Sequence, residues 1–327
     1  MLRIPSALCF LCALQLPLGA QQTPAGRVSD FPNWAYPVPA PAPAGAAAPM
    51  DDGHLRHVPD STVALALKDF AAHVTAVPDW HPEDHPPMPG IVSVGREPAV
   101  WACAYCHLPN GAGRPENASI AGLTPAYFKQ QISDFRSGRR AGSEPARAPQ
   151  NFMIALAKAA TDAEVAKAAD YFASLKPECY VTVVESEAVP VTYVAGAMLA
   201  KVAGGGTEAL GDRIIEFPVD LGRAENRDPR TPYLAYVPVG SLAKGEAIAA
   251  GRRSSAQQCS ICHGPGLKGL GDVPRLAGRS PSYIVRQLYD FKSGTRTGAT
   301  GLMKPVAASL TQADMVAVAA FVSSLKP

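Results

Sequence analysis

A helical pattern of apolar positions is first clear between residues 124 and 138. Thr124 is a typical N-cap residue, and Pro125 suits the first helical position, where a backbone N–H has no intrahelical partner in any case. Apolar and aromatic side chains then recur at helical spacing as far as Phe135. We therefore expect a helix that begins after Thr124 and ends near Gly138.

A second helix is predicted to begin after Thr161. Thr161 and Glu164 have the spacing of a capping box, in which the two residues satisfy each other's backbone N–H groups. The helix should end before Pro177, because Pro cannot continue it. Its apolar residues fall on one face, which we expect to be buried: Val165, Ala168, Ala169 and Phe172.

Residues 242–327 repeat the plan of residues 91–177, so the chain contains two copies of one unit. The final helices match at an offset of 150, residues 173–177 against 323–327. Ten earlier pairs match at an offset of 156, so the first unit carries about six extra residues around 141–150. These pairs are Cys103, Cys106, His107, Gly122, Pro125, Tyr127, Asp134, Phe135, Ser137 and Gly138 with Cys259, Cys262, His263, Gly278, Pro281, Tyr283, Asp290, Phe291, Ser293 and Gly294.

The segment between the units, residues 178–241, has a different pattern. Runs of β-branched and aromatic residues alternate there with Gly and Pro, which is typical of short strands and hairpins. The runs cover residues 180–184, 189–194, 213–219 and 233–237. We expect a partly β inter-domain segment that covers one or both units.

The stretch before the first unit, residues 21–90, is rich in Pro and Ala and does not have the pattern of an ordinary domain. The Pro/Ala/Gly run at residues 37–49 predicts an extended linker. A helix is predicted over residues 61–77, where Val63, Leu67, Phe70 and Val74 have helical spacing. The aromatic residues before the linker are expected to pack onto the body of the protein: Phe31, Trp34 and Tyr36.

Two histidines, His81 and His85, lie near Asp79 and Asp84 in a Pro-rich loop. These side chains suit a metal ion, but a metal site also needs convergent groups that orient its ligands. The sequence shows no such groups, so we interpret both as exposed loop histidines.

Residues 1–20 have the pattern of a secretory signal peptide, with Arg3 before an apolar stretch and a candidate cleavage site at residues 18–20. Leu18 is larger than the residue usually found at such a site, which leaves an uncleaved signal anchor as the alternative. The apolar stretch is shorter than the ~20 residues that span a bilayer. We find no other transmembrane candidate, and we expect an exported, periplasmic protein.

Composition narrows the function classes. The chain has 327 residues, 47% of them hydrophobic, which is enough for about two packed domains. Its formal net charge is only +2 and it has no basic run, so nucleic acid is not an expected partner.

Each unit contains the pattern C-x-x-C-H, the attachment signature of c-type haem. Two thiols form thioether bonds to the porphyrin, and the next residue, His, is then held beneath the iron as an axial ligand. A redox dithiol, a zinc site or a buried disulfide also explains C-x-x-C, but none requires this His. Two copies on an exported chain therefore predict two covalently bound haem c groups, attached and ligated by Cys103, Cys106 and His107 and by Cys259, Cys262 and His263.

Met153 and Met303 are the predicted sixth ligands of the two irons. They match at the offset of 150, just before the last helix of each unit. A lone Met usually fills a core, but a Met at matched positions in two haem units suits a thioether ligand. The alternative ligand in the second unit is Met315, but it lies on the predicted last helix and matches Val165 in the first unit. We expect a loop, stiffened by Pro305, to present Met303.

Each unit resembles a class I cytochrome c domain, and the tandem is similar to the di-haem cytochromes of the cytochrome c4 type. The resemblance rests on C-x-x-C-H, the Ala-Gly-x-x-Pro-x-Tyr and Asp-Phe-x-x-Gly segments and the late Met, over residues 95–177 and 242–327. It implies an all-α fold of two tandem class I cytochrome c domains with neighbouring haems, and electron transfer as the activity. The Pro-rich N-terminal extension and the partly β inter-domain segment depart from that pattern.

These observations divide the chain into five parts. They are a signal peptide (1–20), an N-terminal extension (21–90), cytochrome c domain 1 (91–177), an inter-domain segment with short strands (178–241) and cytochrome c domain 2 (242–327).

The resemblance also implies that a Pro after the motif offers its carbonyl group to the ring N–H of the axial His. Pro274 occupies this place in the second unit, whereas Ala118 occupies it in the first. We expect His107 to be less firmly oriented without the rigid Pro, and the two haems to differ in reduction potential.

The predicted function is the transfer of single electrons by a periplasmic di-haem cytochrome c. Its partners would be redox proteins, namely a dehydrogenase, an oxidase or a respiratory complex, and the chain would also suit the cytochrome subunit of a dehydrogenase. The alternative is a di-haem oxidoreductase that acts on thiosulfate or peroxide, which would require a haem without a stable Met ligand.

Two further features are assigned by residue type alone. Cys179, the one Cys of the mature chain outside the motifs, is interpreted as a small buried side chain, with an intermolecular disulfide or an iron ligand as the other readings. Arg139, Arg140 and Arg296 are candidates to hold the haem propionates, because Arg pairs well with carboxylates.

Overall fold

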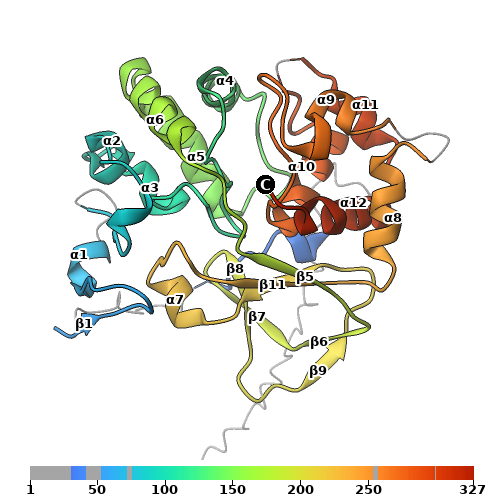
Figure 1. Ribbon diagram of the computed structural model, residues 1–327, viewed down its shortest axis with the longest axis horizontal. Coiled ribbons are helices and arrows are strands. Elements are labelled where there is room, and N and C mark those ends of the chain that lie inside the picture. Colours follow the sequence, from blue (N-terminus) through green and yellow to red (C-terminus); the bar gives the residue numbers. More distant parts are fainter. Residues whose placement is uncertain (1–30, 42–52, 72–75, 253–256, 299) are drawn as a thin grey trace, which may run out of the picture.

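A computed structural model describes residues 31–41, 53–71, 76–252, 257–298 and 300–327. The predicted signal peptide and most of the predicted linker lie outside these residues. Two helical units, α2–α6 and α8–α12, stand above a group of strands in Figure 1. Within the described residues, no helix is both long and apolar enough to cross a bilayer.

The first helical unit follows the predicted helix boundaries closely. The side chain of Thr124 accepts a hydrogen bond from the backbone N–H of Tyr127, and the capping box of Thr161 and Glu164 is formed. The expected face of the last helix is largely buried, with Phe172 fully enclosed. The elements are α2 (Gly90–Ser93), β3 (Gly95–Arg96), β4 (Val100–Trp101), α3 (Cys103–His107), α4 (Pro125–Arg136), α5 (Ala148–Ala159) and α6 (Asp162–Ser174).

The second helical unit repeats this arrangement around a larger core. Its last helix is buried on nearly all sides, and Met315 lies in its core with 1% of its surface exposed. Gly245 allows the first helix to approach so closely that a Cβ atom there would collide with the carbonyl oxygen of Ala317. The elements are α8 (Ser241–Ala249), α9 (Ser260–His263), η3 (Pro265–Leu267), α10 (Pro281–Ser293), α11 (Met303–Ala308) and α12 (Gln312–Ser324).

The predicted loops before the last helices are helical instead. Met153 lies within α5, and Met303 is the first residue of α11. Pro149 and Pro305 both fall in the first turn of these helices, a position that Pro tolerates well. The expectation of a loop that presents Met303 was therefore wrong.

The segment between the units forms strands at the four predicted runs, together with two strands that the sequence did not predict, at residues 198–201 and 207–209. Strand β11 pairs antiparallel with β10 and parallel with β5, and the pairs β6–β9 and β7–β8 are antiparallel. The run predicted at 189–194 is divided between β6, which pairs with β9, and β7, which pairs with β8. The elements are β5 (Val181–Glu185), β6 (Ala188–Pro190), β7 (Thr192–Ala195), β8 (Met198–Lys201), β9 (Thr207–Ala209), β10 (Ile215–Pro218), α7 (Leu221–Glu225) and β11 (Tyr233–Val237).

The helix predicted over residues 61–77 was wrong in its extent. The structure has strand β2 (Leu65–Ala66), paired with β1 (Leu55–Arg56), and then α1 (Leu67–Ala71), while residues 72–75 lie outside the described part. The hydroxyl of Ser61 donates to the carbonyl of Trp80 and accepts from the N–H of Val63, which holds this stretch in an irregular conformation.

The aromatic residues before the predicted linker pack onto the second unit, as expected. Phe31 stacks on Tyr36 and meets the edge of Tyr289, and a short 3-10 helix, η1 (Asn33–Ala35), lies between the first two. The hydroxyl of Tyr36 donates to the carboxylate of Asp290 at 2.8 Å. The described start of the chain is thus fastened to α10.

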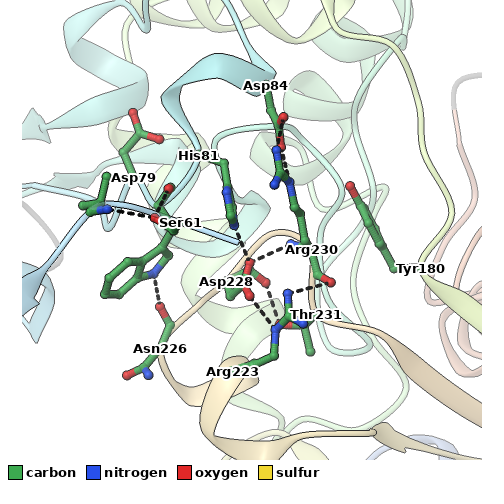
Figure 2. A network of polar contacts seen from close by, with 12 residues as sticks. Ser61, Asp79, His81, Asp84, Tyr180, Arg223, Asn226, Asp228, Arg230 and Thr231 are labelled. Carbon is green, nitrogen blue, oxygen red and sulfur yellow. Dashed lines mark hydrogen bonds and ion pairs between the residues drawn. The ribbon is translucent and has the colours of Figure 1, made fainter. Parts of the chain in front are cut away.

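The prediction that His81 and His85 are exposed was wrong. The side chain of His85 is 4% exposed, with Nε2 3.1 Å from the carboxylate of Asp79, and His81 belongs to a buried polar network (Figure 2). Its Nε2 lies 3.2 Å from the carboxylate of Asp228, which Arg223 contacts at 2.6 Å from the other side. Arg230 donates to Asp84 in the 3-10 helix η2 (Pro82–Asp84). The network joins the N-terminal extension to the inter-domain segment, and the described residues show no metal-binding cluster here or elsewhere.

We expect Asp228→Ala to lower the free energy of unfolding by about 3–5 kcal/mol, because it leaves the partly buried Arg223 guanidinium and the buried His81 without their shared partner. The matched control is Glu208→Ala, which breaks an ion pair with Arg213. The side chain of Glu208 is 40% exposed. That control should cost less than about 1 kcal/mol. Thermal unfolding of the two variants measures the difference, and equal costs would contradict a structural role for the network.

Candidate functional site

The first unit contains a cavity of about 880 Å³ that brings the predicted haem residues together. Cys103, Cys106, His107 and Met153 all line it. The rest of the wall is mainly apolar, with side chains from α2, β4, α4, α5 and α6. A large apolar cavity with a few convergent polar groups is the usual form of a cofactor site.

The predicted ligand histidine of each unit is held by the same backbone contact. His107 Nδ1 lies 2.8 Å from the carbonyl oxygen of Ala118, and His263 Nδ1 lies 2.7 Å from that of Pro274. A carbonyl only accepts, so Nδ1 carries the proton and Nε2 keeps its lone pair for a metal. Burial lowers the pKa of both imidazoles, which favours this neutral form.

Ala118 supplies the same carbonyl group as Pro274, at nearly the same distance. The two units therefore share this hydrogen bond and differ in the rigid Pro ring that carries the acceptor in the second unit. The less firm orientation of His107 and the difference in reduction potential stay predictions.

The second site is more open than the first. His263 is buried, whereas Cys262 is exposed. Cys259 and Met303 pack against the core formed mainly by α8, α10 and α12. These four residues thus lie at the edge of the second core. Cys262 and His263 are on α9, Cys259 directly precedes it, and Met303 begins α11.

The cysteines do not have the properties of a redox dithiol. Burial raises the pKa of Cys103 to about 12 and also raises the pKa of Cys106 and Cys259. A reactive dithiol needs a thiol whose pKa is lowered instead. Among the residues that the structure describes, all five cysteines are free, and no three metal-ligating side chains cluster as a zinc site requires.

The first cavity also has unpaired polar atoms that suit the carboxylates of a haem. Arg147 is 5% exposed, lines the cavity and has no hydrogen-bond partner for its Nε; Gln150 likewise leaves Nε2 buried and unpaired. Burial lowers the pKa of Arg147 to about 9, since its charge is desolvated. Both residues lie in the stretch 141–150, where the first unit carries its extra residues, and an anion in the cavity would satisfy them.

Of the arginines proposed from the sequence, Arg140 and Arg296 form hydrogen bonds across the junction of the two units, and Arg140 also lines the first cavity. Arg139 pairs with Asp134 at 2.9 Å. Arg140 donates to the hydroxyl of Tyr283 at 3.0 Å, and Arg296 donates to that of Tyr127 at 3.2 Å. The last four residues match at the offset of 156, so the contact has an approximate two-fold symmetry.

The backbone follows the same symmetry. The N–H of Ala141 donates to the carbonyl of Thr295 at 2.8 Å, and that of Thr297 donates to the carbonyl of Arg139 at 2.9 Å. As a result, Tyr283 of the second unit forms part of the wall of the first cavity. The two candidate sites are therefore rigidly connected through one polar junction.

Two residues of interest lie where the repeat gives no signal. Met198, in β8, is 4% exposed and places a second thioether in the first cavity, where its sulfur accepts a hydrogen bond from Arg114 at 3.5 Å. Cys179 is partly buried beside Gly278 and is absent from the described lining of that cavity. The packing thus matches the small-side-chain interpretation of Cys179.

Comparison with known proteins identifies both units. Residues 95–176 match the family model "Cytochrome c", and residues 246–322 match "Cytochrome C oxidase, cbb3-type, subunit III". Cytochrome c-554(547) of Halothiobacillus neapolitanus is 36% identical over 87 residues, which are 24% of this chain and 96% of that protein. The chain belongs to the c-type cytochromes. It is a tandem class I cytochrome of the c4 type, and it therefore carries electrons and binds haem c covalently.

Two longer relatives span both units of this cytochrome. A "Thiosulfate dehydrogenase electron acceptor" of Thiomonas intermedia is 27% identical over 239 residues, 69% of this chain and 83% of that protein. A cytochrome c4 of Pseudomonas aeruginosa is 25% identical over 243 residues, 72% of this chain and 89% of that protein.

Met153→Ala should remove about half of the weak charge-transfer band that a Met ligand gives to ferric haem, because thioether ligation is lost in one unit. The matched control is Met198→Ala, which removes the other sulfur of the same cavity and should leave the band unchanged. Absorption spectra of the two oxidised variants decide between the sulfurs, and loss of the band only in the Met198 variant would reverse the assignment.

Arg147→Met should lower one reduction potential by about 60 mV, since a buried positive charge near a haem stabilises its reduced form by on the order of 1–2 kcal/mol. The control is Arg139→Met, whose guanidinium is 42% exposed and already paired with Asp134. Potentiometric titration compares them, and an equal or larger shift in the control would exclude Arg147 as the residue that faces the haem carboxylates.

Proposed function

We propose that the chain binds two haem c groups, one in each unit, and passes single electrons between periplasmic redox partners. Cys103 and Cys106 would attach the first group, with His107 and Met153 as its axial ligands. Cys259, Cys262, His263 and Met303 would have the same roles in the second unit, within the domains proposed at 91–177 and 242–327. The observation that carries this proposal is the first cavity, which is lined by all four predicted residues and by unpaired donors.

The protein side chains set the conditions for electron transfer. Each haem, when bound, supplies an iron that changes its charge by one electron. The carbonyls of Ala118 and Pro274 fix the imidazole tautomers, and the apolar wall excludes water. Methionine ligands would raise the potentials and would leave no open iron position for a substrate.

A dehydrogenase is the electron donor that we propose. The relative from Thiomonas intermedia is named as the electron acceptor of thiosulfate dehydrogenase, and it spans both units. The predicted signal peptide, outside the described residues, supports a periplasmic address. Thiosulfate oxidation would take place on the donor, and this chain would only receive the electrons.

Mixing the oxidised protein with catalytic thiosulfate dehydrogenase and excess thiosulfate should reduce it by two electrons per chain. Absorption of the reduced haem follows the reaction, and dithionite gives the end point. The control is the protein with thiosulfate alone, which should stay oxidised. Rapid reduction in that control would favour an enzyme that oxidises thiosulfate itself, and uptake of a single electron would contradict the second haem.

A further inference from the structure

The two C-x-x-C-H segments differ sharply in exposure at matched positions. Tyr105, between the cysteines of the first unit, is 8% exposed, whereas its counterpart Ile261 is 58% exposed. Further along, the side chain of Arg114 is 8% exposed, whereas its counterpart Leu270 is 56% exposed. Arg114 and Leu270 occupy equivalent positions in the fold, since each forms an isolated β-bridge with the residue three positions further along the chain.

The inter-domain segment covers the first unit at these positions. The guanidinium of Arg227 lies 3.6 Å from the ring centre of Tyr105, and its Nη1 donates to the Tyr105 carbonyl at 2.6 Å. The hairpin of β7 and β8 closes another part of the cavity, with Met198 held by Arg114. We call these parts of residues 193–198 and 225–227 the roof.

The roof is fastened on both sides of Arg227. Trp80 Nε1 donates to the carbonyl of Asn226 at 2.7 Å, and Asp228 is bound by His81 and Arg223 (Figure 2). Asn226 and Asp228 flank Arg227 directly in the chain. The loop that covers Tyr105 is therefore held by buried polar contacts, and the roof is a built part of the fold rather than a passing contact.

The second unit leaves the corresponding surface open. Ile261 precedes the exposed Cys262, and Leu270 lies against the glycine that ends α9. Leu302, which precedes Met303, is 65% exposed. We call Ile261, Leu270 and Leu302 the exchange surface, because Ile261 and Leu302 directly precede the predicted haem residues Cys262 and Met303, and Leu270 lies against Gly264, which follows His263. Exposed apolar side chains beside functional residues commonly mark a protein interface.

We propose that partner proteins exchange electrons with this cytochrome only at the exchange surface of the second unit, and that the roof shields the first unit from them. This inference rests on the function proposed above. A reduced partner would lose one electron to the second unit, and the polar junction would pass it on to the first. No proton or atom moves in the exchange.

The partner fitted by this surface is a redox protein whose contact face has an apolar centre and an acidic rim. Two exposed lysines, Lys268 and Lys304, lie near the apolar residues in sequence. Lys268 also donates to the carbonyl of Pro327 at 3.3 Å, and the carboxylate of that loop, Asp272, keeps its negative charge while it accepts a hydrogen bond from Thr124 at 2.6 Å. The positive lysines would attract carboxylates, and the apolar centre would form the close contact.

Stopped-flow reaction of the haem-loaded, oxidised protein with reduced plastocyanin, a small copper protein with an acidic surface, tests the proposal. Leu270→Glu and Ile261→Glu should each slow the second-order reaction by about tenfold, because a carboxylate replaces an apolar contact and repels the acidic probe. Leu270 lies outside the attachment motif, so its variant separates docking from haem attachment. Haem content is measured for every variant.

The matched controls carry the same added charge elsewhere. Val219→Glu lies next to α7 in the inter-domain segment, and Val239→Glu lies just before α8; these residues are 57% and 65% exposed. Both variants should react at the wild-type rate. A slowing by Val219→Glu equal to that by Leu270→Glu would overturn the proposal, as would an unchanged rate for Leu270→Glu.

A second measurement tests the roof directly. Removing the stacked guanidinium with Arg227→Ala, in the Leu270→Glu background, should restore part of the lost rate by uncovering the first unit. No restoration would mean that the roof does not limit exchange. If the chain binds two haems that dithionite reduces but plastocyanin does not, the stated partner is contradicted and the proposed function still stands. If the chain binds no haem, both are contradicted.

Discussion

The hydrogen bond between a backbone carbonyl and the histidine proposed as the iron ligand is the contact on which both sites depend. Donor and acceptor lie eleven positions apart in each unit, and the loop between them must fold back to bring them together. That return fixes the proton on Nδ1 and directs Nε2 away from the backbone. It also places the next residues at the wall of the site, so one local contact determines both the ligand and the pocket around it.

The approximate symmetry of the two units explains why their junction is polar and tightly connected. Each unit contributes the same Tyr, Gln and Arg, and each Arg crosses to the other unit's Tyr. Because each Arg donates to the Tyr hydroxyl of the other unit, most hydrogen-bond donors at this buried interface have an acceptor. The junction therefore holds two electron-carrying units at a fixed separation, and a second binding surface on the first unit is not needed to reach both.

The sequence predicted the parts of the structure that depend on local chemistry. Capping at Thr124 and Thr161 and the four runs of strand follow from residue type and spacing. The backbone partners of His107 and His263 follow from the resemblance to class I cytochromes c. The parts that depend on distant contacts were missed or wrong. His81 was expected to be exposed because its burial requires Asp228, which lies 147 positions away. Arg147 and Met198 gave no signal, because neither has a counterpart in the repeat.

The central claim is that each unit holds one covalently attached haem, and the haem content of the purified chain tests it most directly. The protein is denatured, extracted with acidified organic solvent to remove any haem that is not covalently attached, and assayed as the pyridine haemochromogen against the measured chain concentration. The account predicts that two haems per chain survive the extraction. One haem per chain would show that one of the two C-x-x-C-H segments is not an attachment site, and none would contradict the account as a whole.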